Sequence, residues 1–277
     1  MCLILLAWRC HPRYRLVVAA NRDEYFKRRT AAAGFWDDHA GVLGGRDLEA
    51  GGTWLGVTLD GRFAALTNYR NPADRNPGAP SRGALVSDFL TAKTSPREYL
   101  QQVERRAPEY NGFSLLVGDA SSLYFLSNRG GLPERVAPGV HGLSNHLLDT
   151  PWPKVEKGKA RFAALLDQPF NPGAALQLLD DTEPAPNGEL PSTGVSLELE
   201  ERLSAIRIPA VGGYGTRCST ALCLGNDGKM EFHERSYLED GGTGATVSYR
   251  LTLGRAKTPA PSRRAGSPPP GTPVPAR

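Results

Sequence analysis

Short apolar runs separated by turn residues fill the first part of the chain and predict a β-sheet that begins at residue 2. Four segments have the length and apolar content of strands, at residues 2–10, 14–21, 53–59 and 62–69. Asp-Gly stands at 60–61, between the last two, and this dipeptide favours the tight turn of a hairpin. We therefore expect antiparallel pairing between consecutive strands.

Helical spacing replaces this pattern after a loop rich in proline and asparagine at residues 70–80. The apolar side chains of residues 84–90 recur roughly at the spacing of one helix face. Ser95 and Glu98 have the three-residue spacing of a capping box, with a proline at the first helical position between them. The pattern therefore predicts two helices within residues 82–107.

The rest of the chain alternates again between the two patterns. We expect strands at 113–119, 123–128, 140–145, 219–225, 229–235 and 246–253, helices at 154–166 and 172–180, and a surface loop at 181–196. Strands and helices are thus segregated rather than alternating, which indicates the α+β class, and two stacked sheets between helix layers would bury this much apolar sequence. No GxGxxG or GxxxxGK[ST] motif is present, so nucleotide binding loses its main support.

The composition of the 277 residues, 40% hydrophobic and 22% charged, is that of an ordinary globular protein. The net charge of +4 comes from residues 256–277, which hold four basic residues and no acidic one. Subtracting those four from the 33 basic residues leaves 29 against 29 acidic residues. We expect residues 1–255 to form a single domain that does not bind nucleic acid, and 256–277 to be a disordered, proline-rich, basic tail. The alternative for the tail is that its PPP run docks in an aromatic groove of a partner.

The longest apolar stretch, residues 2–8, is far shorter than the ~20 residues that span a bilayer, and no basic segment precedes it. We expect a cytoplasmic protein with no membrane span. The four cysteines lack zinc-site spacing and the five histidines are scattered, so we expect free thiols, no metal site and no cofactor.

Cys2 is the first residue with catalytic potential. Removal of Met1 would leave a thiol and a free α-amine on one residue, and an amine with an unperturbed pKa near ~7.7–8.0 can accept a thiol proton. The alternative is that Cys2 is a small apolar residue at the start of a buried strand. Its neighbours favour chemistry, because an antiparallel second strand returns the polar residues 21–24 towards Cys2.

Eight blocks, in order along residues 1–255, resemble the NRDE family, whose named members include eukaryotic transport and Golgi organization proteins. The blocks are MCLILL at 1–6, AANRDEYF at 19–26, GGTWLGV at 51–57, AALTNYR at 64–70, YNGFSLLVGD at 110–119, GLSN at 142–145, TPWPK at 150–154 and YGTRCSTALCL at 214–224. This family is similar to the N-terminal nucleophile hydrolases. The resemblance therefore implies a four-layer αββα sandwich of two mainly antiparallel sheets.

The resemblance also implies roles for individual residues, by analogy with cysteine amidases of that fold. Cys2 would be the nucleophile, Asp23 would hold the protonated α-amine, and Arg22 would lower the pKa of the thiol. Because adjacent strand residues point to opposite faces, the alternative is that Arg22 forms an ordinary ion pair with Glu24.

Asn68 and Asn145 would donate hydrogen bonds to the tetrahedral oxyanion, and Arg217 would complete the site. The alternative for both asparagines is a turn-forming role at strand ends.

Two functions follow. The first is an N-terminal cysteine amidohydrolase that cleaves a small amide. The second is a non-catalytic binding or trafficking protein for a hydrophobic metabolite, haem or an acyl lipid, because eukaryotic members of the family are linked to haem and lipid handling. Catalysis requires a free α-amine on Cys2, whereas binding does not.

Overall fold

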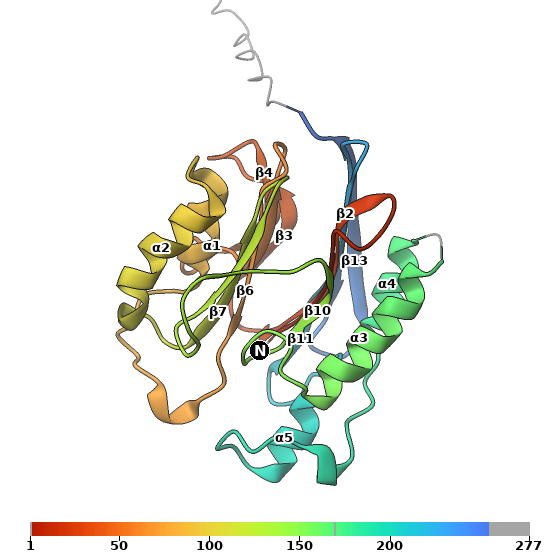
Figure 1. The fold of residues 1–277 in the computed structure, drawn as a ribbon. Helices are drawn as coiled ribbons and strands as arrows, with labels where there is room; N and C mark the ends of the chain where they lie inside the picture. Colours follow the sequence, from red (N-terminus) through yellow and green to blue (C-terminus); the bar gives the residue numbers. More distant parts are fainter. Residues whose placement is uncertain (1, 169, 255–277) are drawn as a thin grey trace, which may run out of the picture.

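Two antiparallel sheets stack face to face in the computed structural model, which describes residues 2–168 and 170–254 (Figure 1). Sheet A has the strand order β10-β1-β2-β11-β12-β13, with bounds β1 Cys2–Trp8, β2 Tyr14–Tyr25, β10 Gly139–Leu143, β11 Tyr214–Gly225, β12 Lys229–Tyr237 and β13 Thr243–Thr252. Sheet B runs β3-β4-β5-β6-β7-β8-β9, with bounds β3 Thr30–Phe35, β4 Val42–Asp47, β5 Leu55–Thr58, β6 Phe63–Asn68, β7 Phe113–Gly118, β8 Leu123–Ser127 and β9 Glu134–Arg135.

Helices cover the outer faces of both sheets. Their bounds are α1 Gly83–Thr91, α2 Pro96–Arg106, α3 Pro153–Leu166, α4 Pro172–Leu178 and α5 Leu197–Leu203, with short 3-10 turns at Pro72–Asp74, Ala107–Glu109 and Asn187–Glu189. Figure 1 shows α1 and α2 outside sheet B and α3 and α4 outside sheet A. The predicted α+β class and αββα order of layers are therefore confirmed. No helix of the described residues is long and apolar enough to cross a membrane.

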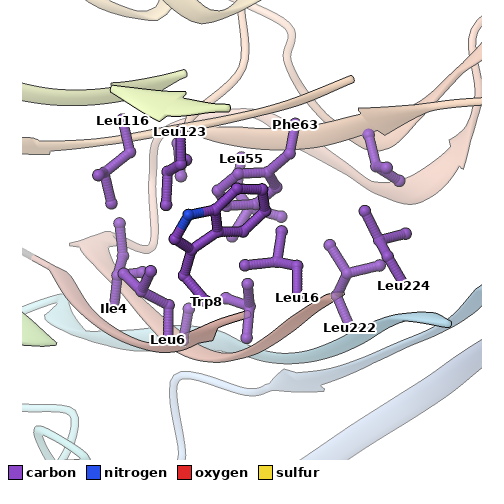
Figure 2. Packing of buried hydrophobic residues seen from close by; sticks show 14 of the residues in the cluster. Ile4, Leu6, Trp8, Leu16, Leu55, Phe63, Leu116, Leu123, Leu222 and Leu224 are labelled. Atoms are coloured by element: carbon purple, nitrogen blue, oxygen red, sulfur yellow. The ribbon is translucent and has the colours of Figure 1, made fainter. Parts of the chain in front are cut away.

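Strand β1 contributes side chains to two hydrophobic cores, because successive residues of a strand point to opposite faces of the sheet. Ile4, Leu6 and Trp8 of β1 point into the space between the sheets, and the residues between them point towards the helices. Figure 2 shows Trp8 at the centre of the inter-sheet packing, with Leu16 of β2 and Phe63 of β6 around it. Burial on both faces is what makes β1 a continuous apolar run.

The turns and caps expected from the sequence are present. Gly61 follows Asp60 with φ of 83° and Gly228 ends the 226–228 turn with φ of 82°, values that favour glycine. The Ser95 side chain accepts from the Glu98 backbone while the Glu98 side chain accepts from the Ser95 backbone, so α2 begins with the predicted capping box.

Several elements differ from the sequence expectation. β2 continues to Tyr25, so residues 21–24 lie inside a strand instead of ending one. β3 and β4 were not predicted, because TAAAGF and VLGGRD offer small residues instead of an alternating apolar pattern. The helix α5, capped by Ser196, follows directly on the predicted loop. The predicted single domain stays a prediction, and the predicted tail at 256–277 lies outside the described residues.

Candidate functional site

A cavity of about 380 Å³ opens between the two sheets at the end where β1 begins. Cys2 and Arg22 reach it from sheet A, Asn68 reaches it from the end of β6 in sheet B, and Arg217 reaches it from β11. Arg82, just before α1, closes another side. The cavity therefore collects five of the six residues that the resemblance assigned, because Asp23 also lines it, together with Arg82, which the resemblance did not assign.

The strand register places Arg22 between two cysteines. Cys2 of β1 and Cys218 of β11 are both direct partners of Arg22 on β2, so the three side chains share the face of sheet A that turns towards sheet B. Arg22 Nη1 donates to Thr30 Oγ1 at 3.3 Å. Among the described residues it forms no ion pair with Glu24, so that alternative is wrong.

Asp23 points to the other face, as expected for the residue next to Arg22. Its Oδ1 accepts a hydrogen bond from Thr216 Oγ1 at 2.6 Å, and its side chain is almost fully buried. Because Arg22 is the direct partner of Cys2, Asp23 lies one residue further along β2. The adjacent pair thus points to opposite faces of sheet A, and Arg22 is the one of the two that shares the face of Cys2.

Burial dominates the electrostatics of Cys2, which is only 8% exposed. Burial raises the pKa of the thiol, the carboxylate of Asp23 raises it further, and Arg22 lowers it. The resemblance implied that Arg22 would lower the pKa of the thiol, and the contribution of Arg22 has that direction. The net direction is the opposite, because desolvation of the thiolate outweighs the nearby positive charge.

Lys154 is a buried cation that the sequence analysis missed. It is the second residue of α3, its side chain is 2% exposed, and its Nζ has no hydrogen-bond partner among the described residues. Burial lowers its pKa to about 8, while Asp23 opposes that shift. The sequence contained two indications of this position. The helical period puts Lys154 on the same buried face as Val155 and Phe162, and the residue lies in the first turn of the helix, where a positive charge is unfavourable.

The two asparagines have different positions. Asn68 lines the cavity, and its side-chain amide makes no hydrogen bond to the described part of the protein. Asn145 is fully buried in the left-handed region, with φ of 56°, and its Nδ2 donates to the Asn68 carbonyl at 2.9 Å. Ser144 beside it donates to the carbonyl of Cys2 at 3.1 Å. Asn145 therefore holds the end of β6 and its neighbour Ser144 holds the start of β1, while Asn68 lines the cavity.

Arg217 occupies the extra position of a β-bulge in β11, where the register against β2 shifts between Thr216 and Cys218. Its Nη1 donates to the backbone carbonyls of Tyr25, Phe26 and Arg28, at 2.8, 3.2 and 3.1 Å. These bonds hold the guanidinium at the rim of the cavity.

The sequence matches the profile of the family described as "Transport and Golgi organisation 2" over residues 1–239. It is 38% identical to the mouse Transport and Golgi organization 2 homolog, over 91% of this chain and 99% of the relative. The human homolog is 35% identical with the same coverage, and the Drosophila melanogaster protein is 30% identical over 85% of this chain and 92% of its own.

Solved structures are similar at a lower level. A Caenorhabditis elegans N-acylethanolamine-hydrolyzing acid amidase ortholog has a TM-score of 0.49 and 11% identity, covering 80% of this chain and 92% of its own. The C2A mutant of a conjugated bile acid hydrolase from Clostridium perfringens has a TM-score of 0.39 and 10% identity, covering 91% and 98%. The family profile and the curated relatives carry the assignment. The chain belongs to the Transport and Golgi organisation 2 family, as its motifs indicated.

Proposed function

We propose that the protein is an N-terminal cysteine amidohydrolase that cleaves a small amide in the cavity between the sheets. The observation that supports the proposal is the register at the start of β1, in which Cys2 pairs with Arg22 and Asp23 follows one residue further along β2. A residue that is nucleophile and base at once needs a partner for each group.

The first half-reaction transfers the acyl group to sulfur. With Met1 removed, the neutral α-amine of Cys2 takes the thiol proton, and the thiolate attacks the amide carbonyl to form a C–S bond. Asp23 stabilises the resulting ammonium, and Asn68 donates from its side-chain amide to the oxyanion. One donor of this kind in an oxyanion hole contributes ~2.7–4 kcal/mol. Collapse breaks the C–N bond, and the ammonium returns its proton to the leaving amine.

The second half-reaction regenerates the enzyme. Water attacks the thioester while the α-amine takes one of its protons, the C–S bond breaks, and the acid leaves with the hydroxyl oxygen. The sulfur then regains the proton from the ammonium. Burial raises the pKa of Cys2, so the thiol is held neutral until a substrate is present, and transfer to the adjacent amine supplies the thiolate locally.

Intact-mass measurement and acyl trapping test this proposal. The purified protein should lack Met1, and brief incubation with an amide library followed by acid quench should add one acyl mass to the peptide that begins at Cys2. Cys2→Ala should abolish both adduct and turnover, whereas Cys10→Ala, at an exposed thiol outside the cavity, should retain them. Retention of Met1 on an active protein would contradict the α-amine mechanism.

The second candidate is a binding protein for a hydrophobic metabolite such as haem or an acyl lipid, which uses the cavity without chemistry. The raised pKa of the Cys2 thiol, caused by burial, favours it, because an unreactive thiol suffices for binding. The names of the relatives, which refer to transport and Golgi organization, are compatible with such a role. Binding of a metabolite by a protein that retains Met1, with no acyl adduct, would favour it over the amidohydrolase.

A further inference from the structure

Three arginines of the cavity are each fixed to the protein by one nitrogen. Arg22 Nη1 donates to Thr30, Arg82 Nη1 donates to the Gly112 carbonyl at 2.9 Å, and Arg217 Nη1 donates to three carbonyls. None of the three contacts a carboxylate within 4.0 Å in the part of the chain that the structure describes. Each side chain is thus positioned without its charge being neutralised.

The same edge of the guanidinium group is without a protein hydrogen-bond acceptor from the described residues in all three arginines. Within residues 2–168 and 170–254, Nε and Nη2 of Arg22, Arg82 and Arg217 donate to no protein acceptor. That edge presents two parallel N–H groups, the geometry that binds a carboxylate or a phosphate. Arg28, which also lines the cavity, shows the edge occupied, because its Nε and Nη2 both donate to Asp47 Oδ2.

The remaining charges at the cavity do not cancel the three arginines. Arg28 is neutralised by Asp47, and Arg46 is neutralised by Asp38 at 2.9 Å. Burial raises the pKa of Glu234, which favours its neutral form. Asp23 also lines the cavity, but it is almost fully buried and its Oδ1 accepts a hydrogen bond from Thr216. Glu24 is the carboxylate left beside them, and its Oε1 accepts from the backbone of Tyr25.

We propose that Arg22, Arg82 and Arg217 form an anion-binding subsite, so that the ligand of this cavity carries a carboxylate, sulfonate or phosphate group next to the amide. The subsite deepens the proposed function, on which its catalytic meaning rests, by restricting the substrate to anionic N-acyl compounds. Binding of the anion would orient the scissile carbonyl towards Cys2, which lines the same cavity.

Binding can be measured separately from turnover. We would titrate the Cys2→Ala variant by calorimetry with N-octanoylglycine, N-octanoyl-O-phosphoethanolamine and N-octanoylethanolamine, which share an acyl chain and an amide and differ in the terminal group. The carboxylate or the phosphate should bind at least about tenfold more tightly than the alcohol, because charge-assisted bidentate bonds are stronger than neutral ones. Comparison of the first two shows which anion the subsite prefers.

Arg82 is the residue to change, because the proposed reaction does not use it. In the Cys2→Ala background, Arg82→Gln should weaken binding of the preferred anion about tenfold or more and leave the alcohol unchanged. Arg46→Gln is the matched control, since Arg46 lines the same cavity but is already paired, and it should change the affinity less than twofold. If Arg82→Gln fails to fold, Arg82→Lys retains the charge and loses the bidentate edge, so it should weaken binding to a smaller extent.

Equal affinity for the alcohol and both anions, or anion binding insensitive to Arg82, would overturn the subsite. Turnover of the same three amides by the Cys2 protein is scored separately. Selective anion binding without any hydrolysis would refute the amidohydrolase and leave the subsite standing, whereas hydrolysis of all three at equal rates would do the reverse.

Discussion

The two ends of strands β1 and β2 have opposite character. At one end Leu6, Trp8 and Leu16 pack in the inter-sheet core with no more than 3% of any side chain exposed. At the other end the same face of the same strands carries Cys2 and Arg22 into a polar cavity. The same face of β1 and β2 thus lines the apolar core at one end and the polar cavity at the other. The residues that stabilise the fold are separated in this way from those that line the cavity.

The polar end also holds the groups that oppose folding. Lys154 Nζ is buried without a hydrogen-bond partner among the described residues, and burial raises the pKa of both Asp23 and Cys2. Burying such groups is unfavourable unless they are paired. The apolar end must offset this, so substitutions at the two ends should change stability in opposite directions.

The largest change in stability is expected from the apolar end. Leu6→Ala removes a fully buried side chain between the sheets and should lower the free energy of unfolding by about 2–5 kcal/mol, through lost burial and the cavity left behind. Urea denaturation measures this. Leu132→Ala, at a side chain that is 75% exposed, is the control and should change stability by no more than ~0.5 kcal/mol. Similar losses at both positions would contradict the proposed division.

Lys154→Met should instead stabilise the protein at neutral pH. The folded-state pKa of Lys154 is about 8, below the unfolded value of ~10.4, so below pH 8 the folded protein holds a buried charge that the variant lacks. The gain is up to about 3 kcal/mol there, and it disappears as the pH rises through ~10.4, because the wild-type lysine is then neutral in both states.

Urea denaturation of wild type and variant between pH 6 and 10.5 checks this prediction. Lys159→Met on the same helix is the matched control, since Lys159 is partly exposed and paired with Asp149 at 2.9 Å. The control should leave the pH dependence above pH 8 unchanged. A loss of stability in Lys154→Met at pH 7 would mean that the buried amine stabilises the native fold.

The part of the structure that can be predicted from the sequence differs between the two ends of β1 and β2. The apolar end is predictable because its strands are regular apolar runs. Other elements with a clear local signal are equally predictable, such as the hairpin with the Asp60–Gly61 turn and the helix that begins with the Ser95–Glu98 capping box. The weakly patterned strands β3 and β4 form because β5 and β12 lie beside them, and such tertiary context is not visible in a local window.

The polar end depends on residues that are distant in sequence. The hairpin of β1 and β2 was enough to predict that Arg22 returns to Cys2. The approach of Arg82 and Lys154 was not predictable in this way, because each comes from the start of a helix packed on a different sheet. The direction of the Cys2 pKa also depends on burial, which only the assembled layers produce.

A smaller difference between the two ends should appear in thiol labelling. Cys10 lies just beyond the apolar end of β1 and is exposed, whereas Cys2 is buried and its thiol pKa is raised by that burial. In the ligand-free protein, limiting iodoacetamide at pH 7 should therefore label Cys10 faster than Cys2. Cys218 and Cys223 should be slower still, because burial raises the pKa of each of these thiols well above its usual value. Peptide mapping gives the order, and faster labelling of Cys2 than of Cys10 would show that the site activates the thiol despite its burial.

A much smaller change in stability than that of Leu6→Ala is expected from Cys2→Ala. The Cys2 side chain lines an open cavity, so removal of its sulfur enlarges a space that is already present instead of creating a closed void in the core. We expect the free energy of unfolding to change by less than about 1 kcal/mol in urea denaturation. Cys223→Ala is the matched comparison, because Cys223 packs in the core between sheet A and its helices, and it should lose more stability. A larger loss at Cys2 than at Cys223 would show that the thiol is part of the packing of the fold, and the separation of stability from chemistry along β1 would not hold.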